Sequence, residues 1–445
     1  MSDVEEFIKA ACVPLDASHS SGTLDRANSI LARYPEVASA SIYAAAVLGD
    51  GGAVTGYITS DSAAATRKGG PYDWDALSYL CFSRYLRLDK ARSDRFVTAA
   101  RALLDAGADP NTGWWENNHQ PNAAFEPVLY GAAGVAHHAG LTRLLIDRGA
   151  DPNADEIVYH TPEGYDNGAL EALVESGKLT PDSLATMLLR KHDWHDYDGV
   201  VFLLSHGAQP NHLTRWQRTA FQHAILRDND LDIIRQLLDH GANPDYPAIP
   251  LSPGALAARR GRGDVLEELN KRGISIQLDG VDRLIAACAT DDADSIEKIA
   301  REKPELVARL VSEGGKLLAE FSGVGNTPGV RRLLDLGVSV TERFKEGDGY
   351  YGIAKNSNAL HVAAWRAQHS TVKLLIARGA EVEATNAAGE TPLQLAVKAC
   401  VDSYWMERRS PESVKALLAA GASGRAIPLP TGYAEIDALI EVHPK

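Results

Sequence analysis

The sequence is poor in cysteine, with four among 445 residues. Cys12, Cys81, Cys288 and Cys400 lie far apart, and their spacing matches neither a zinc site nor a thioredoxin-type motif. The pattern predicts reduced cysteines that pack as small apolar residues in the core. Because no metal-binding motif is recognised, we expect neither a metal ion nor another cofactor.

A long apolar segment is also missing. No run of about 18 apolar residues occurs, so no membrane-spanning helix is expected. The first residues, MSDVEEFIKAACVPLD, are acidic and contain neither a basic, apolar leader nor a small-residue cleavage pattern. These two absences predict a cytoplasmic protein that does not bind a membrane.

Basic residues are fewer than acidic ones. The chain has 45 Lys and Arg against 59 Asp and Glu, which gives a formal net charge of −14. On average such a chain repels phosphate backbones, so nucleic acid is not an expected partner. Hydrophobic residues make up 45% and charged residues 23% of the chain, which excludes a disordered or collagen-like protein and predicts a packed core.

A recurring phrase organises the chain: a double leucine, a few polar residues, a glycine and a short turn. Clear copies are LLDAGADPN ending at Asn111 and LLIDRGADPN ending at Asn153. The apolar residues before each glycine have helical spacing, so each phrase predicts the end of an amphipathic helix with a left-handed glycine after it. The shortest intervals between these glycines are 32 and 34 residues. The glycines are Gly107, Gly149, Gly207, Gly241, Gly273, Gly337, Gly379 and Gly421.

This period, together with an inner motif, resembles the ankyrin repeat family. In that family each unit opens with Thr-Pro-Leu-His-x-Ala and continues as two antiparallel helices and a glycine turn. Residues 391–396 read TPLQLA, residues 359–364 read ALHVAA and residues 219–224 read TAFQHA. Threonine can cap the first helix, proline suits its first turn, and alanine lets neighbouring units pack closely. The resemblance implies a scaffold whose surface decides what it binds.

We therefore predict an all-α ankyrin-repeat solenoid of about ten helix-turn-helix units with aromatic-rich finger loops and helical end caps. The N-terminal cap spans residues 1–40, the repeat array 41–425 and the C-terminal cap 426–445. Insertions are expected near residues 56–72, 112–125, 154–180, 341–357 and 402–411. First helices are expected to begin near residues 41, 75, 127, 182, 219, 254, 282, 315, 358 and 391.

Four of the loops between repeats are long and carry aromatic side chains. In an ankyrin solenoid these finger loops project beside the concave face. Aromatic residues are unfavourable when left bare in water, so they either pack against one another or contact a ligand. The second alternative gives a candidate binding site that consists of Trp114, Trp115, His119, Tyr159, His160, Glu163, Tyr165, Arg215, Trp216, Tyr350 and Tyr351.

Motifs for catalysis are absent: the sequence has no Gly-x-Ser-x-Gly elbow, no phosphate-binding loop and no His-Glu-x-x-His helix. This favours a binding protein over an enzyme. We expect a protein partner that is recognised through the concave face and the finger loops. The alternative is an enzyme or a receptor for a small polar ligand, such as a saccharide, held in a cleft between enlarged loops. A deep cleft with converging Trp, His and carboxylate side chains would favour the alternative, and an open groove would favour a protein partner.

Overall fold

The computed structural model describes residues 2–247 and 250–442. Helices dominate, and two compact units divide the chain. Unit 1 comprises Met1–Ala220 with Asp239–Gly241, and unit 2 comprises Phe221–Leu238 with Ala242–Lys445. The sequence predicted one repeat array between two caps. In the structure, the residues form two compact units.

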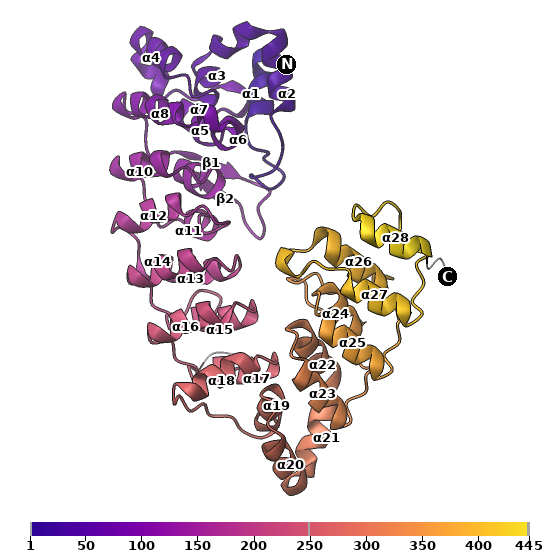
Figure 1. Ribbon diagram of the computed structural model, residues 1–445. Helices are drawn as coiled ribbons and strands as arrows, with labels where there is room; N and C mark the ends of the chain where they lie inside the picture. The colour runs from indigo at the N-terminus through magenta and orange to yellow at the C-terminus, as the bar shows by residue number, and fades with distance from the viewer. Residues whose placement is uncertain (1, 248–249, 443–445) are drawn as a thin grey trace. The chain divides into compact units, whose positions relative to one another are not determined.

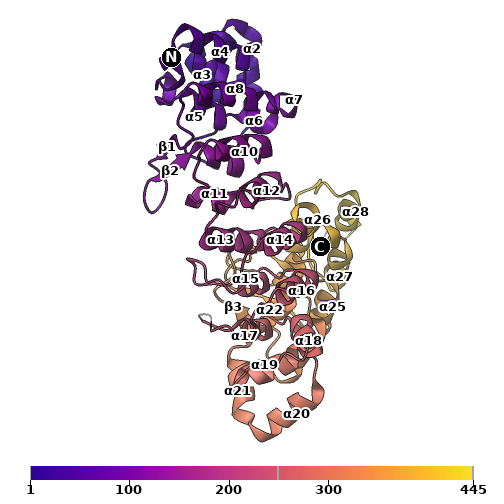
Figure 2. The same cartoon turned by 90° about the vertical axis from the view of Figure 1, so that its left-hand side faces the viewer.

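Unit 1 is a stack of helix pairs in chain order, from α3 and α4 to α13 and α14, with a β-hairpin at one edge (Figures 1 and 2). The hairpin consists of β1 (Gly113–Glu116) and β2 (Ala124–Pro127). Short 3₁₀ segments span Pro35–Ser39, Ser62–Ala65 and Gly70–Tyr72, and a π-helical turn spans Gly131–Val135. The helices are α1 (Asp3–Ala11), α2 (Asp25–Arg33), α3 (Ile42–Val47), α4 (Gly51–Ser60), α5 (Ala76–Cys81), α6 (Arg84–Leu88), α7 (Lys90–Ser93), α8 (Arg95–Asp105), α9 (Val128–Tyr130), α10 (Ala139–Asp147), α11 (Asp155–His160), α12 (Gly168–Glu175), α13 (Pro181–His192) and α14 (Tyr197–Ser205).

Unit 2 continues with helix pairs and contains a second short hairpin, β3 (Arg343–Phe344) and β4 (Ser357–Asn358). A 3₁₀ turn spans Met406–Arg408. The helices are α15 (Ala220–Leu226), α16 (Leu231–Asp239), α17 (Pro253–Arg259), α18 (Gly263–Lys271), α19 (Val281–Ala289), α20 (Ala293–Glu302), α21 (Pro304–Ser312), α22 (Gly314–Gly323), α23 (Thr327–Asp335), α24 (Ala359–Trp365), α25 (His369–Ala377), α26 (Pro392–Asp402), α27 (Glu412–Ala419) and α28 (Ala434–Val442).

The first helices begin where their motifs indicate. Each of the ten expected starts lies within one residue of an observed helix start, and side-chain caps fix several of them, including those of α24 and α26. At α26 the Thr391 hydroxyl accepts a hydrogen bond from the Gln394 amide, and the Gln394 side chain accepts one from the Thr391 amide. Asn358 and His361 form the equivalent capping box at α24. These reciprocal bonds satisfy amide groups that a helix start would otherwise leave unpaired.

Glycine turns end the second helices as expected. All eight glycines of the recurring phrase have φ between 69° and 103°, a conformation that only glycine adopts without strain. A second left-handed position, which no sequence motif predicted, lies between the two helices of a pair. Several residue types occupy this position, with φ between 50° and 75°, so no single residue type identifies it in the sequence. These residues are Gly49, His137, His195, Asp228, Gly261, Asp291, Gly325 and Ala367.

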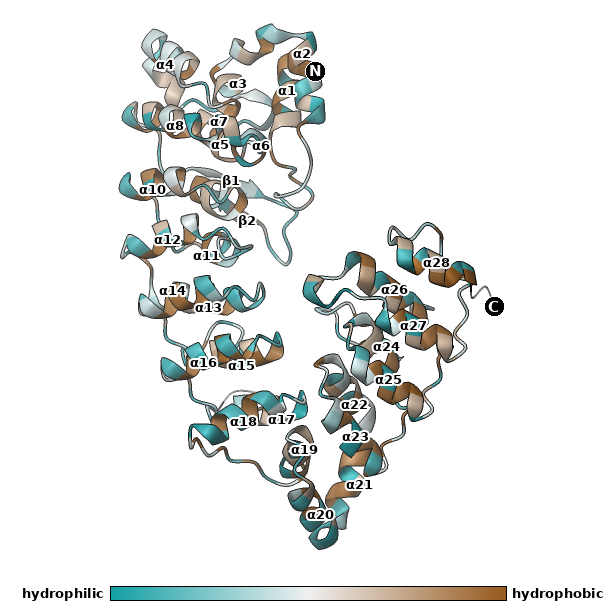
Figure 3. Ribbon diagram, viewed as in Figure 1, coloured by the Kyte–Doolittle hydropathy of each residue, from teal (hydrophilic) through white to brown (hydrophobic). Residues whose placement is uncertain are grey.

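The second helices are amphipathic. In α16 the side chains of Ile233, Ile234, Leu237 and Leu238 are buried, and Figure 3 shows hydrophilic residues within the same helix. Each pair therefore covers an apolar face by packing on the next pair.

One expected insertion has a different structure. Residues 154–180 contain the pair α11 and α12, followed by Gly177 with φ of 66°. The segment resembles an insertion in sequence because α11 is short and lacks the Thr-Pro opening. As a result Tyr159 and His160 lie on a first helix, and Glu163 and Tyr165 lie in the turn within a pair, not in a finger loop.

Candidate functional site

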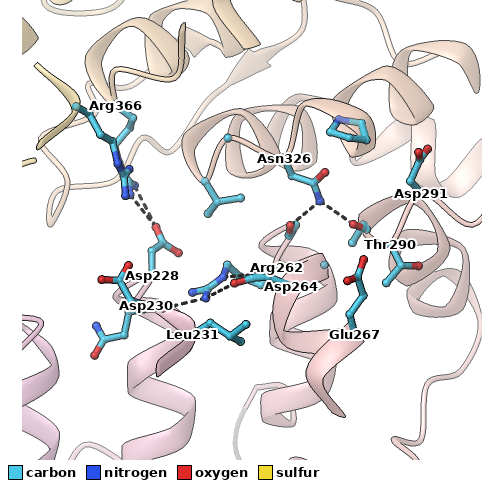
Figure 4. A pocket seen from close by; sticks show the side chains of 18 residues that line it. Asp228, Asp230, Leu231, Arg262, Asp264, Glu267, Thr290, Asp291, Asn326 and Arg366 are labelled. Carbon is cyan, nitrogen blue, oxygen red and sulfur yellow. Dashed lines mark hydrogen bonds and ion pairs between the residues drawn. The ribbon is translucent and has the colours of Figure 1, made fainter. Parts of the chain in front are cut away.

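Unit 2 contains a cavity of about 420 Å³ at the turns between paired helices (Figure 4). Most of its polar groups bond to one another. The Asn326 side chain donates to the Gly261 and Ala289 carbonyl oxygens, both at 2.7 Å. Arg262 donates to Asp264 at 2.8 Å and to the Asn229 carbonyl oxygen at 2.8 Å. These bonds join turns that are distant in sequence and give the cavity a structural role.

The buried carboxylate of Asp228 is the centre of this network. It accepts hydrogen bonds from Arg260 at 3.1 and 3.2 Å and from Arg366 at 3.0 and 3.1 Å. Burial alone would raise the pKa of Asp228, but the two guanidinium groups hold it well below its usual range. Tyr351 adds a hydrogen bond from its hydroxyl to the Leu226 carbonyl oxygen at 3.1 Å. Asp228 and Arg366, which are 138 positions apart in the sequence, are thus held together within unit 2.

Unit 1 contains a larger cavity of about 720 Å³, here called the unit 1 cleft. Its walls come from the segment after α1, the α6–α7 region, the β1–β2 hairpin, the turn after α9, α11 with the turn that follows it, and the end of α13. The lining residues are Ala17, Ser18, His19, Ser20, Arg87, Lys90, Glu116, His119, Tyr130, Gly134, Val135, Ala136, His137, Glu156, His160, Glu163, Gly164, Tyr165, Asp166 and Trp194.

One side of the cleft is a chain of ion pairs on α11 and α13. His160 Nε2 lies 3.2 Å from Glu156, and His160 Nδ1 lies 3.0 Å from Glu163. Arg190 donates to Glu163 at 2.9 Å. Burial disfavours the charged imidazole, but its hydrogen bonds to the two carboxylates outweigh this effect and raise the pKa of His160 to about 9. His160 is therefore an imidazolium at neutral pH, and it neutralises part of the acidic charge.

His19 behaves in the opposite way. Its Nδ1 lies 3.0 Å from the Tyr130 hydroxyl, and its side chain is only 8% exposed. Burial lowers the pKa of His19 to about 4, so the ring is neutral at pH 7. His19 Nε2 faces the Glu116 carboxylate at 3.9 Å, which is too far for a hydrogen bond, and this buried nitrogen has no hydrogen-bond partner.

Glu126 places a further carboxyl group near these residues. It is 1% exposed, and neither of its carboxyl oxygens has a hydrogen-bond partner. Burial raises the pKa of Glu126 to about 8, and the charges of Glu156 and Glu116 act in the same direction. Burial is thus the main reason that the Glu126 carboxyl group is protonated at neutral pH, and the two neighbouring carboxylates add to this effect.

Aromatic side chains border the cleft. Tyr165 is 70% exposed and Trp194 is 37% exposed, and their rings meet edge to face with centroids 6.3 Å apart. Their exposure beside a charged cavity is typical of a binding surface.

The structure separates the sequence-predicted residues into groups. His119, His160, Glu163 and Tyr165 line the unit 1 cleft together. Tyr159, Arg215 and Trp216 form another cluster in unit 1, in which the Tyr159 and Trp216 rings lie 5.8 Å apart.

Two more predicted residues lie in unit 2. Tyr350 is partly exposed beneath the Arg227 guanidinium. Tyr351 was expected at a binding surface, but it is buried beneath Arg366, at 4.0 Å from the ring centroid, and takes part in the Asp228 network.

The hairpin divides the adjacent tryptophans. Successive side chains of a strand point to opposite faces, so Trp114 and Glu116 share one face and Trp115 lies on the other. Trp114 was expected to contact a ligand, but it is 6% exposed and stacks on Trp74 at 5.1 Å. Trp115 remains exposed and contacts Phe125. Packing against Trp74 therefore accounts for the burial of Trp114, whereas the exposed Trp115 side chain can contact a ligand.

Several cleft residues were absent from the sequence prediction. Glu116 and Trp194 carried a weak signal, because they stand in loop segments rich in charge and aromatic residues. His19, Tyr130 and Glu156 carried none. They come from three segments that only the folded chain brings together.

Within residues 2–247 and 250–442, no group of three or more His, Cys, Asp or Glu side chains has the geometry to hold a metal ion. Over the same part of the chain, every helix is too short or too polar to cross a bilayer.

The paired helices and their glycine turns define a helical-repeat protein. The sequence model of the ankyrin repeat family matches residues 216–248 and 355–387, so the chain contains ankyrin repeats. Ankyrin repeats are general protein–protein interaction modules. Among curated proteins, no sequence matches this chain.

Solved structures with some similarity include two ankyrin repeat domains. The domain of Bcl-3, a member of the IkappaB family, is 19% identical, with 52% of this chain and 96% of that chain covered and a TM-score of 0.24. The human ASB11 domain is 20% identical, with 53% and 97% covered and a TM-score of 0.23. The ankyrin repeats of this chain are identified by the family match over residues 216–248 and 355–387.

Proposed function

We propose that the chain binds a protein partner, and that the unit 1 cleft receives an extended segment of that partner. The observation that carries the proposal is the combination of exposed aromatic rings and incompletely paired charged groups around one cavity. Tyr165 and Trp194 supply the rings, the buried His19 Nε2 has no hydrogen-bond partner, and the Glu116 carboxylate lies 3.9 Å from it. Binding surfaces concentrate their energy in such aromatic anchors next to polar groups.

The cationic residues of the cleft suit a peptide backbone. Arg87 and Lys90 line the cavity and can donate hydrogen bonds to main-chain carbonyl oxygens. The Arg87 Nε is buried and has no hydrogen-bond partner. An extended segment would therefore meet donors, acceptors and apolar rings in the same cleft.

A small polar ligand, such as a saccharide, is the second candidate. It is favoured by the convergence of His119, Glu163 and Trp194 on one cavity of about 720 Å³, a size within the range of small-molecule sites. Rings stacked on a sugar and carboxylates bonded to its hydroxyl groups would use the same side chains.

Selection from a displayed random peptide library tests the first proposal. The immobilised full chain serves as bait, and enriched peptides are synthesised and titrated. Replacing Tyr165 and Trp194 by alanine should weaken their binding about tenfold or more, because aromatic anchors dominate such contacts. Tyr404→Ala, at an 88% exposed ring in unit 2, is the control and should leave binding unchanged.

Failure to enrich any peptide that depends on these two rings would contradict the peptide-binding proposal. A thermal-shift screen with sugars and common metabolites examines the second candidate, because a ligand that binds only the folded state raises the melting temperature. A shift that disappears in Glu163→Ala would favour the small-ligand receptor.

A further inference from the structure

We propose that His19 and Glu116 form a pocket within the unit 1 cleft for a basic side chain, the guanidinium or ammonium group of a protein partner's Arg or Lys. This inference depends on the proposed function and assigns the chemistry of the segment that the cleft receives. The pocket lies where the segment after α1 crosses the β1–β2 hairpin.

The geometry leaves room for a shared hydrogen-bond donor. His19 Nε2 and the Glu116 carboxylate face each other at 3.9 Å without a hydrogen bond between them. In the neutral tautomer that donates from Nδ1 to Tyr130, Nε2 has a free lone pair. A guanidinium or ammonium group can then donate to Nε2 and to the carboxylate at once.

The surroundings favour a positive charge at this point. Glu116 is only 15% exposed, and among the described residues the basic group found within 4 Å of its carboxylate is the neutral His19. Glu126, fully buried nearby, has an elevated pKa of about 8 because of burial and the charges of Glu156 and Glu116. A bound cation would instead pair with the little-exposed Glu116 carboxylate.

Other occupants fit less well. An anion would be repelled by Glu116 and by the neighbouring carboxylates. A metal ion needs three or more converging ligands, which the described part of the chain does not provide here. The basic groups of the cleft do not fill the pocket: His160 is already held by Glu156 and Glu163, and no ion pair joins Arg87 or Lys90 to Glu116 among the described residues. A basic side chain is the occupant that supplies what both His19 and Glu116 lack.

The experiment compares two capped tripeptides, acetyl-Gly-Arg-Gly-amide and acetyl-Gly-citrulline-Gly-amide. Citrulline has the shape of arginine without its charge. Both are titrated onto the full chain at pH 7 and followed by saturation-transfer NMR of the peptide. We expect the arginine peptide to bind about tenfold or more tightly, as charge-assisted hydrogen bonds imply.

Two variants locate the preference. Glu116→Gln keeps the side-chain shape and removes the charge, so it should abolish the preference for arginine. His19→Asn places a polar atom near the position of Nδ1 and removes Nε2, so it should reduce the preference while Tyr130 keeps a partner. The control is Glu175→Gln, at an exposed glutamate of the same unit that pairs with Arg143 outside the cleft. Circular dichroism establishes that each variant is folded.

The outcomes separate this inference from the proposed function. An equal affinity for both tripeptides, or an arginine preference that survives in both variants, overturns the basic pocket. Displayed peptides that bind through Tyr165 and Trp194 without a basic residue also overturn it, although peptide binding itself would stand. A preference lost in Glu116→Gln supports the pocket, even if the library yields no longer peptide and the extended-segment proposal fails.

Discussion

Two histidines of the unit 1 cleft show how immediate neighbours decide the charge of a side chain. His160 lies between two carboxylates, whereas His19 is buried against Tyr130 and Trp114. The pKa is about 9 for the first and about 4 for the second. The same residue type therefore supplies a fixed cation in one wall of the cleft and a neutral hydrogen-bonding group in the other.

The charge on His160 leads to a pH-dependent stability. Because its folded pKa of about 9 exceeds the ordinary 6.5, the ion pairs contribute stability that is fully present below pH 6.5 and is lost as the pH rises through 9. His160→Gln should lower the free energy of unfolding by roughly 1–3 kcal/mol at pH 6.5 and by much less at pH 9.5. Urea denaturation at the two pH values measures this difference. An equal loss at both values would contradict the assigned protonation.

Repeated turns set the geometry of the helix pairs. Glycine follows the second helix of many pairs, and a second left-handed residue connects the two helices within a pair. The first position is almost always glycine. A side chain there would meet almost no neighbouring atom, so the left-handed backbone conformation, and not lack of space, selects glycine. The second position accepts Asp228 or His137, because Asp and His adopt left-handed backbone more often than most other residues.

Two glycine substitutions should have opposite effects. Gly207 has φ of 93° and open space around it, so Gly207→Ala should reduce stability by about 1 kcal/mol through backbone strain alone. Gly56 lies within helix α4, also in open space but without positive φ, so Gly56→Ala should increase stability by about 0.5–1 kcal/mol. Thermal unfolding of both variants tests this; changes of the same sign would mean that the backbone conformation of one of the two glycines is misassigned.

Within unit 2 the fold depends on contacts between repeats far apart in sequence. Asp228 joins the turn after α15 to Arg260 after α17 and to Arg366 after α24. Glu320 on α22 pairs with Arg260 at 2.9 Å. These four charges are buried together, so each depends on the others for its hydrogen bonds. A linear stack of repeats would have no such network, because each repeat would contact only its neighbours.

Removing the central charge should destabilise unit 2 selectively. Asp228→Asn keeps the side-chain size but leaves two buried guanidinium groups without their main counter-charge, at a cost of about 3–5 kcal/mol. Since the folded pKa of Asp228 is depressed, its stabilising contribution is present above about pH 4 and is lost as the pH falls below that value. Hydrogen exchange at pH 7 should show faster exchange in α17, α22 and α24 but not in α10. The control, Asp230→Asn, changes an exposed neighbour.

A loss below about 1 kcal/mol in Asp228→Asn would indicate that apolar packing, not the charge network, holds these repeats together. Faster exchange throughout unit 1 as well would show that the two units unfold together.

Local sequence determined the helix pairs. Thr391, Asn358 and the eight glycines act through bonds and backbone angles within a few residues, so their effect can be inferred without the rest of the chain. Helix α11 was not predicted, because a short first helix without a capping motif carries no local signal. For the same reason Glu163 and Tyr165 were predicted in a finger loop, although they lie between α11 and α12.

The candidate site was decided by tertiary structure. The sequence predicted four residues of this site: His119, His160, Glu163 and Tyr165. They line one cleft with His19, Tyr130 and Glu156 only because the segment after α1 and the hairpin pack on the repeats. Burial likewise separated Trp114 from Trp115, although the two are adjacent and chemically identical. Helix caps and turns are set by interactions between neighbours in sequence, whereas exposure, pKa and the shape of a cleft depend on groups that only folding brings together.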